Sequence, residues 1–395
     1  MVLTNKQEEG LREAVSRYQN GERWTCIAGY AGTGKSTLVK FIISALDVNP
    51  EEVCYVAYTG KAAQVLKQKG CPNAVTAHKL LYKAKSMPNG TYKFEPKLSI
   101  GDYKIIVVDE VSMLPKQMWN RLLSHNIYIL ACGDPFQLPP IDPDADNHVL
   151  DNPHVFLDEI MRQAYDSEII RFSMWIREGK PLNEFPASNK EVMLINKNEI
   201  STGMYEWADQ ILCATNAQRH NVNTHMRQIK GFGPEPQVGD KIISLHNQWD
   251  FLSSGNDPSP LTNGSIGTVS TLSKRNVKLP YWISPKMMPV LYTTMIDDNG
   301  DKFDYIPIDY TALTTGEKFL TGQQEYTMRK YDKCPDPPFE FAYAYGITTH
   351  KSQGSEWEKV LVIEENFPRP VIEHARWAYT AATRASEKLV WSKKN

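Results

Sequence analysis

Short apolar runs alternate with polar, helix-forming segments through the first 150 residues. The runs RWTCIA (23–28), VCYVA (53–57), IIVV (105–108) and YILACG (128–133) have the length and composition of buried strands. The segment STLVKFIISAL, which follows the first glycine-rich stretch, has apolar residues at helical spacing. Strands that alternate with helices in this way predict an α/β fold.

The pattern changes between residues 235 and 335. VGDKIISL, LTNGSIGTVSTL and PVLYTTMIDDNGDKFDYIPI are rich in strand and turn signals, and the last contains Asp-Asn-Gly at 298–300 between two alternating runs. We therefore expect a small β-barrel in this region. A second hairpin signal, Asn89 and Gly90 within residues 82–101, interrupts the first α/β region.

Composition limits the class of protein. A chain of 395 residues exceeds the roughly 250–300 residues at which a single core stops growing, so we expect several domains. No stretch approaches the roughly 18 apolar residues of a membrane span, and the six cysteines are scattered without a Cys-x-x-Cys pair. We expect a soluble, cytoplasmic protein with reduced thiols, no structural metal and no membrane partner. Because the net charge is −2, nucleic-acid binding would have to come from local clusters.

The segment GYAGTGKS (29–36) lies between the first strand and the first helix. It fits the Walker A pattern, in which glycines let backbone amides approach phosphate oxygens and the helix N-terminus adds a positive dipole end. Lys35 is expected to reach the β and γ phosphates, and Ser36 to ligate magnesium. The sequence therefore predicts that ATP and Mg²⁺ bind here. The residues expected to contact the nucleotide are Gly29, Ala31, Gly32, Thr33, Gly34, Lys35, Ser36 and Thr37.

Polar residues also follow the third and fourth of these strands. Asp109 and Glu110 form a Walker B candidate, with Asp109 holding Mg²⁺ and Glu110 orienting and deprotonating the attacking water. The alternative is that these carboxylates cap a helix N-terminus. Gln137 lies beyond a strand end, at the edge where open α/β sheets bind ligands, and is a candidate sensor of the γ phosphate. The alternative for Gln137 is a turn residue beside prolines.

An ordered series of further motifs extends over almost the whole chain. Its segments are NKQ (5–7), GYAGTGKS (29–36), AYTGKAA (57–63), TAH (76–78), DEVSM (109–113), GDPFQLPP (133–140), LDEIMRQ (157–163), ITTHKSQGSEW (347–357) and YTAATRA (379–385). In this order they resemble the motif series of superfamily 1 DNA helicases of the 5′ to 3′ branch, the RecD-like and Pif1-like enzymes, and the match is highly specific.

The resemblance implies a domain plan and an activity. Two RecA-like domains are expected, at 1–150 and at 151–234 with 336–395, and ATP is expected between them. The hairpin at 82–101 would be a pin inserted in the first domain, and residues 235–335 would form an SH3-like β-barrel inserted in the second. A helicase of this family moves 5′ to 3′ on single-stranded DNA and unwinds duplex at single-strand/duplex junctions. We expect a monomer in the cytoplasm of a bacterial or phage-infected cell.

The resemblance also assigns residues around the nucleotide. Arg162 and Arg384 would be delivered from the second domain to stabilise charge on the γ phosphate. Gln7 would recognise the adenine edge, while Gly354, Ser355 and Glu356 would face the nucleotide. Met161 departs from relatives that place an aromatic residue before the arginine, so the residue that stacks on adenine is unassigned.

Single-stranded DNA would be held by two polar clusters, one in each RecA-like domain. These contacts reach backbone phosphates and carry no base code, so binding is expected to be sequence-independent and salt-dependent. Without the family, His78 is an ordinary helix-entry residue, and residues 350–351 form a solvated turn. The implied DNA contacts are Thr59, Gly60, Lys61, Thr76, His78, Thr349, His350, Lys351, Ser352 and Gln353.

Aromatic residues in the two insertions have two interpretations. In the pin, Tyr92 or Phe94 would present a ring to the separating base pair, or would instead pack the hairpin against its own domain. In the barrel, Trp249, Phe251, Tyr281 and Trp282 are either stacking platforms or core residues.

Two other functions are compatible with parts of the sequence. A P-loop nucleotide kinase explains the Walker segments but leaves THKSQGSEW and YTAATRA without a role. An ATP-driven translocase, clamp or annealing factor that does not unwind shares the helicase motifs, and the pin hairpin is the feature that discriminates it from a helicase. The sequence does not assign a pathway among replication, recombination and repair.

Overall fold

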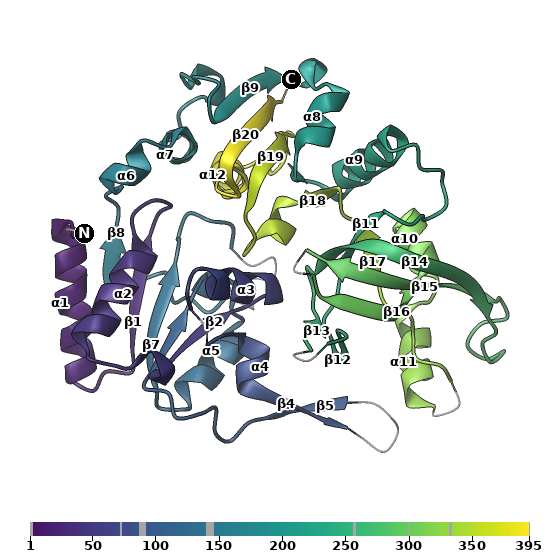
Figure 1. Cartoon of the computed structure of the whole chain (residues 1–395), viewed down its shortest axis with the longest axis horizontal. Coiled ribbons are helices and arrows are strands. Elements are labelled where there is room, and N and C mark those ends of the chain that lie inside the picture. Colours follow the sequence, from purple (N-terminus) through teal and green to yellow (C-terminus); the bar gives the residue numbers. More distant parts are fainter. Residues whose placement is uncertain are drawn as a thin grey trace. The chain divides into compact units, whose positions relative to one another are not determined.

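A computed structural model of the chain shows two compact units (Figure 1). Unit 1 comprises Met1–Lys83, Glu95–Asn216 and Thr348–Asn395, and unit 2 comprises Ala84–Phe94 and Ala217–Ile347. The structure describes residues 3–71, 73–86, 92–139, 146–255, 258–298, 300–331 and 334–394, with the backbone alone for residues 84–86, 92–94, 162, 163 and 249. Within these residues no helix is long and apolar enough to cross a membrane.

Unit 1 contains two sheets, and the first is formed by the N-terminal half of the chain. Its six strands lie in the order β3-β2-β6-β7-β1-β8, and every neighbouring pair is parallel. The expected α/β fold with parallel strands is therefore confirmed here. The strands are β1 (Trp24–Gly29), β2 (Val53–Ala57), β3 (Ala74–Thr76), β6 (Ile105–Val108), β7 (Tyr128–Gly133) and β8 (Val155–Leu157).

Helices cover both faces of this sheet. Successive residues of a strand point to opposite faces, and in β6 Ile105 packs with the core formed by α1 and α2 whereas Ile106 packs with the core formed by α4 and α5. Strands buried on both faces read as continuous apolar runs, which explains the sequence pattern. The helices are α1 (Asn5–Gln19), α2 (Lys35–Ala45), α3 (Gly60–Gln68), α4 (Ala77–Leu81) and α5 (Lys116–Leu123), with short 3-10 turns at Pro50–Glu52 and Val111–Met113.

The second sheet of unit 1 has the strand order β18-β10-β19-β20-β9. The pairs β10·β19, β19·β20 and β20·β9 are parallel. Rings of Phe172 in α7 and Trp377 in α12 both contact Trp391 in β20, which anchors these helices on the sheet. The elements are β9 (Val192–Asn196), β10 (Gln210–Cys213), β18 (Gly346–Thr348), β19 (Trp357–Ile363), β20 (Ala385–Lys393), α6 (Arg162–Tyr165), α7 (Glu168–Arg177), α8 (Thr202–Trp207) and α12 (Val371–Ala382), with 3-10 turns at Leu182–Glu184, Lys197–Glu199 and Thr349–Ser352.

Unit 2 is built on an antiparallel sheet with the order β16-β15-β14-β11-β17. The hairpin predicted around 298–300 is confirmed by the antiparallel pairing of β15 and β16. A further bridge joins Ile308 of β16 to Phe339, just before β17, so the two edge strands of the sheet are connected. The elements are α9 (Asn216–Ile229), β11 (Lys241–Ser244), β12 (Gln248–Leu252), β13 (Pro260–Leu261), β14 (Ile266–Val277), β15 (Met288–Asp297), β16 (Lys302–Asp309), α10 (Tyr310–Thr315), α11 (Gly322–Lys330) and β17 (Phe341–Tyr343).

The hairpin predicted within 82–101 consists of β4 (Tyr82–Ser86) and β5 (Tyr92–Pro96), which pair as a two-stranded sheet. The turn at Asn89 and Gly90 lies outside the described residues, as do the side chains of Tyr92 and Phe94. The side chain of Trp249, one of the aromatic residues singled out in the second insertion, also lies outside them. Of the other three, Phe251 is partly buried against the core of the sheet, whereas Tyr281 and Trp282 are exposed.

Candidate active site

The GYAGTGKS segment forms a loop between β1, which ends at Gly29, and α2, which begins at Lys35. The backbone at Gly32 and Gly34 has φ of +77° and +79°, a left-handed conformation that favours glycine. A Cβ atom on Gly34 would lie 2.4 Å from Met161 Sδ. Lys35 Nζ donates to the carbonyl oxygens of Gly29 at 2.7 Å and Tyr30 at 3.0 Å. The loop therefore holds the ammonium group of Lys35 at the N-terminus of α2, where a phosphate would bind.

Gln7 joins α1 to this loop. Its Oε1 accepts from the backbone N–H of Thr4 at 3.0 Å, and its Nε2 donates to the carbonyl of Thr33 at 3.1 Å. The side chain is buried. Both ends of the amide predicted to recognise adenine are thus bonded within the protein, and this capping interaction fixes the N-terminus of α1 against the phosphate-binding loop.

The carboxylates predicted from the Walker B pattern follow β6. Glu110 has φ of +48°, a conformation that costs energy for a residue other than glycine and is concentrated at functional sites. Its backbone N–H donates to Asp109 Oδ1 at 3.1 Å. Burial raises the pKa of Glu110, while the positive charge of Arg384 acts in the opposite direction. Its Oε2 is buried and has no hydrogen-bond partner among the described residues.

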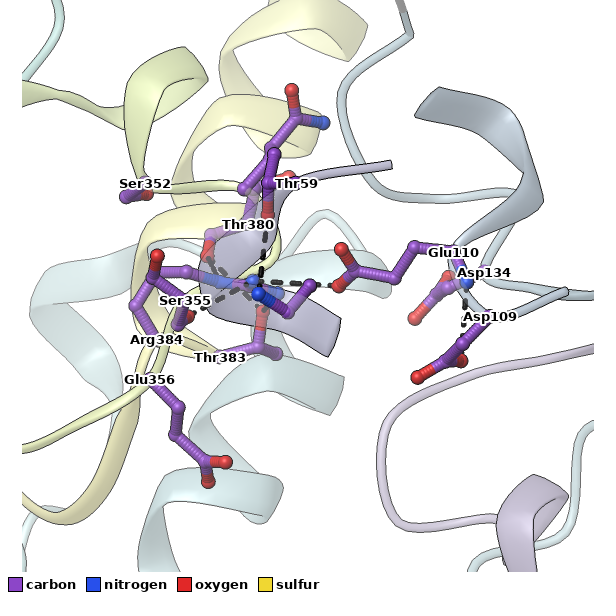
Figure 2. Close-up of polar contacts among 12 residues, drawn as sticks. Thr59, Asp109, Glu110, Asp134, Ser352, Ser355, Glu356, Thr380, Thr383 and Arg384 are labelled. Carbon is purple, nitrogen blue, oxygen red and sulfur yellow. Dashed lines mark hydrogen bonds and ion pairs between the residues drawn. The ribbon is translucent and has the colours of Figure 1, made fainter. Parts of the chain in front are cut away.

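Arg384 reaches Glu110 from the C-terminal end of the chain (Figure 2). Its Nη1 lies 3.5 Å from Glu110 Oε1, and the side chain is almost fully buried. Three other bonds fix the guanidinium: Nε to the Thr380 carbonyl at 3.1 Å, Nη1 to the Ser355 carbonyl at 3.2 Å and Nη2 to Thr383 Oγ1 at 3.3 Å. The arginine is therefore held in one orientation, beside the predicted catalytic carboxylate.

A cavity of about 490 Å³ lies where loops from the two sheets of unit 1 meet. This volume falls within the roughly 300–1,000 Å³ typical of small-molecule sites. The structure thus brings together, in one cavity, residues that the sequence separates by more than three hundred positions. The predicted residues that line it are Ala31, Ser36, Asp109, Glu110, Gln137, Gly354, Glu356 and Arg384.

Some cavity residues were not identified by sequence reasoning. Lys69 in the cavity wall forms an ion pair with Glu356, with 3.2 Å between Nζ and Oε2. Thr383 also lines the cavity and, together with Ser355, which the resemblance did implicate, holds Arg384. A lysine at the end of a helix-forming segment gives no sequence signal of this kind, because its partner lies in a distant motif.

The site predicted around Arg162 is described only in part. Arg162 begins α6, and the preceding Met161 N–H donates to the Gly32 carbonyl at 3.0 Å, which places this segment beside the phosphate-binding loop. The side chain of Arg162 lies outside the described residues. Thr37, also predicted to contact the nucleotide, lies in the first turn of α2.

The first predicted DNA-binding cluster lies at the N-termini of α3 and α4. Thr59 Oγ1 accepts from the Ala62 N–H at 3.2 Å, and Gly60 is the first residue of α3. Lys61 Nζ lies 4.3 Å from the ring centroid of Trp357, a cation–π contact. A Cβ atom on Gly354 would lie 3.1 Å from Thr59 Oγ1 and 3.3 Å from Glu110 Oε2. This cluster is therefore adjacent to the cavity.

At α4, Thr76 Oγ1 accepts from the Lys79 N–H at 3.2 Å and so caps the helix. Burial lowers the pKa of His78 to about 4. The imidazole of His78 is consequently neutral at pH 7.

The second predicted DNA-binding cluster, residues 349–353, is mostly buried. Ser352 Oγ donates to the Thr349 carbonyl at 2.7 Å, and Gln353 Nε2 donates to the Leu138 carbonyl at 2.7 Å. Thr349 Oγ1 donates to the carbonyl of Cys213 at 3.4 Å. These three side chains organise the loop from within.

His350 and Lys351 are half-buried, and burial lowers the pKa of His350. Of the five predicted residues in this loop, His350 and Lys351 are therefore the ones whose side chains reach the surface of unit 1.

Comparisons with known proteins match this arrangement. An AAA domain matches residues 2–197, and a UvrD-like helicase C-terminal domain matches residues 343–391. The chain is 24% identical over 416 residues to the ATP-dependent RecD2 DNA helicase of Deinococcus radiodurans, covering 98% of this chain and 50% of the relative. It is 29% identical over 147 residues to the ATP-dependent DNA helicase dda of Enterobacteria phage T4, covering 36% of this chain and 34% of that relative. The chain thus spans from a third to a half of the length of these relatives.

Solved structures share the fold. The Pif1 helicase of Candida albicans superposes with a TM-score of 0.50 at 20% identity, covering 100% of this chain and 95% of that chain. Pif1 from Bacteroides in complex with ADP-AlF3 and ssDNA gives a TM-score of 0.52 at 19% identity, covering 100% and 93% of the two chains. The two family matches and the relatives thus make the chain similar to the superfamily 1B helicases, among them RecD2, Pif1 and Dda, and the solved structures share its fold.

Proposed function

We propose that the chain is an ATP-driven DNA helicase that moves 5′ to 3′ on single-stranded DNA and unwinds duplex. The observation that carries this proposal is the meeting of Glu110 and Arg384 at one cavity. Glu110 belongs to the sheet that carries the phosphate-binding loop, and Arg384 to the other sheet. An enzyme that merely held a nucleotide would not require a charged residue from a second sheet. A motor does, because the arginine links hydrolysis to the relative movement of the two sheets.

The domain plan is part of the proposal. The two sheets of unit 1, with the parallel pairs described above, support RecA-like domains at 1–150 and at 151–234 with 336–395. The antiparallel strands β11, β14, β15 and β16 support an SH3-like barrel at 235–335, because all four lie within that range. The paired strands β4 and β5 support a pin at 82–101.

The residues of the cavity fit ATP and Mg²⁺. The Ser36 hydroxyl and the Asp109 carboxylate, which are hard oxygen ligands, line the same cavity, and the buried Glu110 Oε2 without a partner is an acceptor for a water molecule. Bound Mg²⁺ would neutralise phosphate charge. Glu110 would orient the attacking water and take its proton, a role that its raised pKa assists by making it a stronger base.

Positive groups would stabilise the charge that develops on the γ phosphoryl oxygens. Lys35 would act from the phosphate-binding loop, and Arg162 and Arg384 from the second sheet. Gln137 would position the water from the loop after β7, and Gln7 would contact the adenine edge after exchanging one of its internal hydrogen bonds.

DNA would contact the two polar clusters of unit 1. Lys61, His78, His350 and Lys351 have side chains suited to direct phosphate contact, while the buried Thr76, Thr349, Ser352 and Gln353 would shape the loops. Thr59 and Gly60 would offer a hydroxyl and a backbone amide. We propose single-stranded DNA and single-strand/duplex junctions as the partners of a monomer that acts in the cytoplasm of a bacterial or phage-infected cell.

The test is the rate of ATP hydrolysis with and without single-stranded DNA. We expect strong stimulation by DNA in the presence of Mg²⁺, and a loss of kcat on the order of 10²–10³-fold in Lys35→Ala, typical of removing one charge-stabilising group. DNA binding by Lys35→Ala should persist, because Lys35 and the DNA clusters lie on different loops. ATP hydrolysis that is indifferent to DNA would contradict the proposal and favour a nucleotide kinase.

A further inference from the structure

The helix α12 contacts two loops of the first sheet through neighbouring residues. Tyr379 and Thr380 lie in its last turn, and both are buried. The loop that carries Gln137 follows β7, and the phosphate-binding loop follows β1. Asp134 and Thr380 appear near Arg384 and Glu110 in Figure 2. One turn of helix thus touches the elements on which the proposed hydrolysis depends.

The hydroxyl of Tyr379 joins the two loops directly. It accepts from the backbone N–H of Ala31 at 2.7 Å and donates to Asp134 Oδ2 at 2.6 Å. Ala31 lines the cavity, and Asp134 begins the loop that carries Gln137. Burial raises the pKa of Tyr379 well above its usual range, so the hydroxyl keeps its proton and can make both bonds at once. The ring is fixed by an edge contact with Phe136, with 5.2 Å between centroids.

The Gln137 loop is also held at its other end. The Leu138 N–H donates to Thr380 Oγ1 at 2.9 Å, and the Leu138 carbonyl accepts from Gln353 Nε2 at 2.7 Å. Gln137 therefore lies between two anchored positions, Asp134 and Leu138. Asp134 bonds to α12, and Leu138 bonds both to α12 and to the loop at 349–353. Both of these elements adjoin the second sheet of unit 1.

Arg384 lies five residues after Tyr379 on the same segment. Its Nε bonds to the Thr380 carbonyl, so any displacement of the last turn of α12 moves the guanidinium as well. The Tyr379 hydroxyl therefore joins the phosphate-binding loop to the loop of Gln137, through Asp134, and to the helical turn that bonds Arg384.

We propose that Tyr379 is a positioning residue that couples the phosphate-binding loop to Arg384 and Gln137. Through one hydroxyl, α12 holds the backbone at Ala31 and the loop at Asp134. The side chains of Gln137 and Arg384 are thereby directed at the same ATP. This inference rests on the proposed ATPase function and adds a residue that neither the Walker segments nor the arginine assignment includes.

The test compares Tyr379→Phe with Tyr345→Phe. The first change removes the hydroxyl and keeps the ring against Phe136. Tyr345 is a matched control in unit 2, where its buried hydroxyl donates to the buried carboxylate of Asp240 at 3.1 Å. We expect Tyr379→Phe to lower the kcat of DNA-stimulated ATP hydrolysis by about 10–100-fold, the usual effect of misplacing catalytic groups. Tyr345→Phe should keep kcat within about 2-fold.

Nucleotide binding separates positioning from a loss of structure. For Tyr379→Phe we expect the affinity for ADP to stay within about 3-fold of the unmodified protein. The affinity for ADP with aluminium fluoride, which imitates the transition state, should fall about as much as kcat. Equal losses for both ligands, or a melting temperature well below that of Tyr345→Phe, would mean a structural role and overturn the inference.

A double-mutant cycle tests the partner. Asp134→Ala should lower kcat, and Tyr379→Phe should add little in the Asp134→Ala background, because both changes break the same bond. Additive effects would overturn the coupling. If the unmodified protein lacks DNA-stimulated hydrolysis, the proposed function itself fails. If it is active and Tyr379→Phe matches it, the inference alone fails.

Discussion

Glu110 occupies a position that opposes folding. Its backbone is left-handed, one carboxylate oxygen is buried without a partner among the described residues, and burial raises its pKa. A raised pKa in the folded state means that the ionised carboxylate destabilises the fold above that pKa, and that stability increases as the pH falls through it. Sites that carry out chemistry commonly retain such costs.

Glu110→Gln should therefore be inactive and more stable. We expect a melting temperature higher by about 1–3 °C at pH 8, since the neutral amide avoids the burial of charge, together with a fall in kcat on the order of 10²–10³-fold. The gain should shrink as the pH is lowered from 8 to 5, because the carboxylate of the unmodified protein then takes up a proton. Thermal melts at several pH values measure this.

Glu356→Gln is the matched control for this prediction. Glu356 lines the same cavity, but it is exposed and pairs with Lys69 at the surface, where ion pairs contribute little. Its melting temperature should match the unmodified protein at each pH. A lower melting temperature for Glu110→Gln than for Glu356→Gln would show that the contact with Arg384 outweighs the cost of burial.

The sequence predicts individual cavity residues unevenly. Ser36 and Asp109 follow strand ends in patterns whose spacing is dictated by phosphate and metal chemistry, so the pattern locates them. Tyr379 lies in the segment YTAATRA, but nothing in that segment indicates its two partners, a backbone amide and a carboxylate hundreds of residues away. Ser352 and Gln353 lie in a polar segment whose resemblance implies DNA contacts, yet they bond to carbonyls inside the protein.

At the scale of elements, local signals were sufficient for strands and hairpins. β6 is a continuous apolar run because helices cover both its faces, and the turn residues at 298–300 predict the β15–β16 pair. The strand order of unit 2 could not be predicted in this way. It depends on β11 pairing with β17 across nearly one hundred residues, for example Ile243 with Ala342, and nothing local specifies that register.

The β4–β5 hairpin provides a prediction about an element. Replacing residues 86–96 with a short Gly-Asn turn should abolish strand separation and leave DNA-stimulated ATP hydrolysis within about 3-fold. The reason is that the cavity residues lie on other loops and that Leu81, which precedes β4, remains in the core of unit 1. A forked duplex with a fluorophore and quencher reports separation, and a coupled assay reports hydrolysis.

Two further variants make the hairpin experiment more specific. Tyr92→Ala with Phe94→Ala tests whether the aromatic rings alone are responsible, and Lys35→Ala gives the background for both assays. Equal loss of separation and hydrolysis in the shortened hairpin would contradict the pin assignment and favour a hairpin that supports its own domain.

At the scale of the whole molecule, the net charge is close to zero, and the groups proposed to hold DNA are concentrated near the cavity. The net charge is −2, so long-range attraction does not bring DNA to the protein. The groups proposed to hold DNA adjoin the cavity instead: Thr59 lies beside Gly354 and Glu110, and Lys61 lies against Trp357. In the proposed mechanism, a change at the nucleotide would therefore reach the proposed DNA-binding clusters through direct contacts in unit 1.

This proximity leads to a prediction about direction. If the two clusters alternate their hold as ATP is hydrolysed, each cycle moves the chain one way along a polar strand, so unwinding should depend on the polarity of the single-stranded tail. With Mg²⁺ and ATP, we expect strand separation from a duplex with a 5′ tail and little from one with a 3′ tail. Raising the salt concentration should weaken binding to both substrates, because phosphate contacts dominate.

Lys35→Ala is the control, and it should bind each substrate and separate neither. Efficient separation from the 3′ tail alone would reverse the proposed direction while leaving the ATP-dependent mechanism in place, and equal separation from both tails would indicate that the protein melts junctions without directional movement.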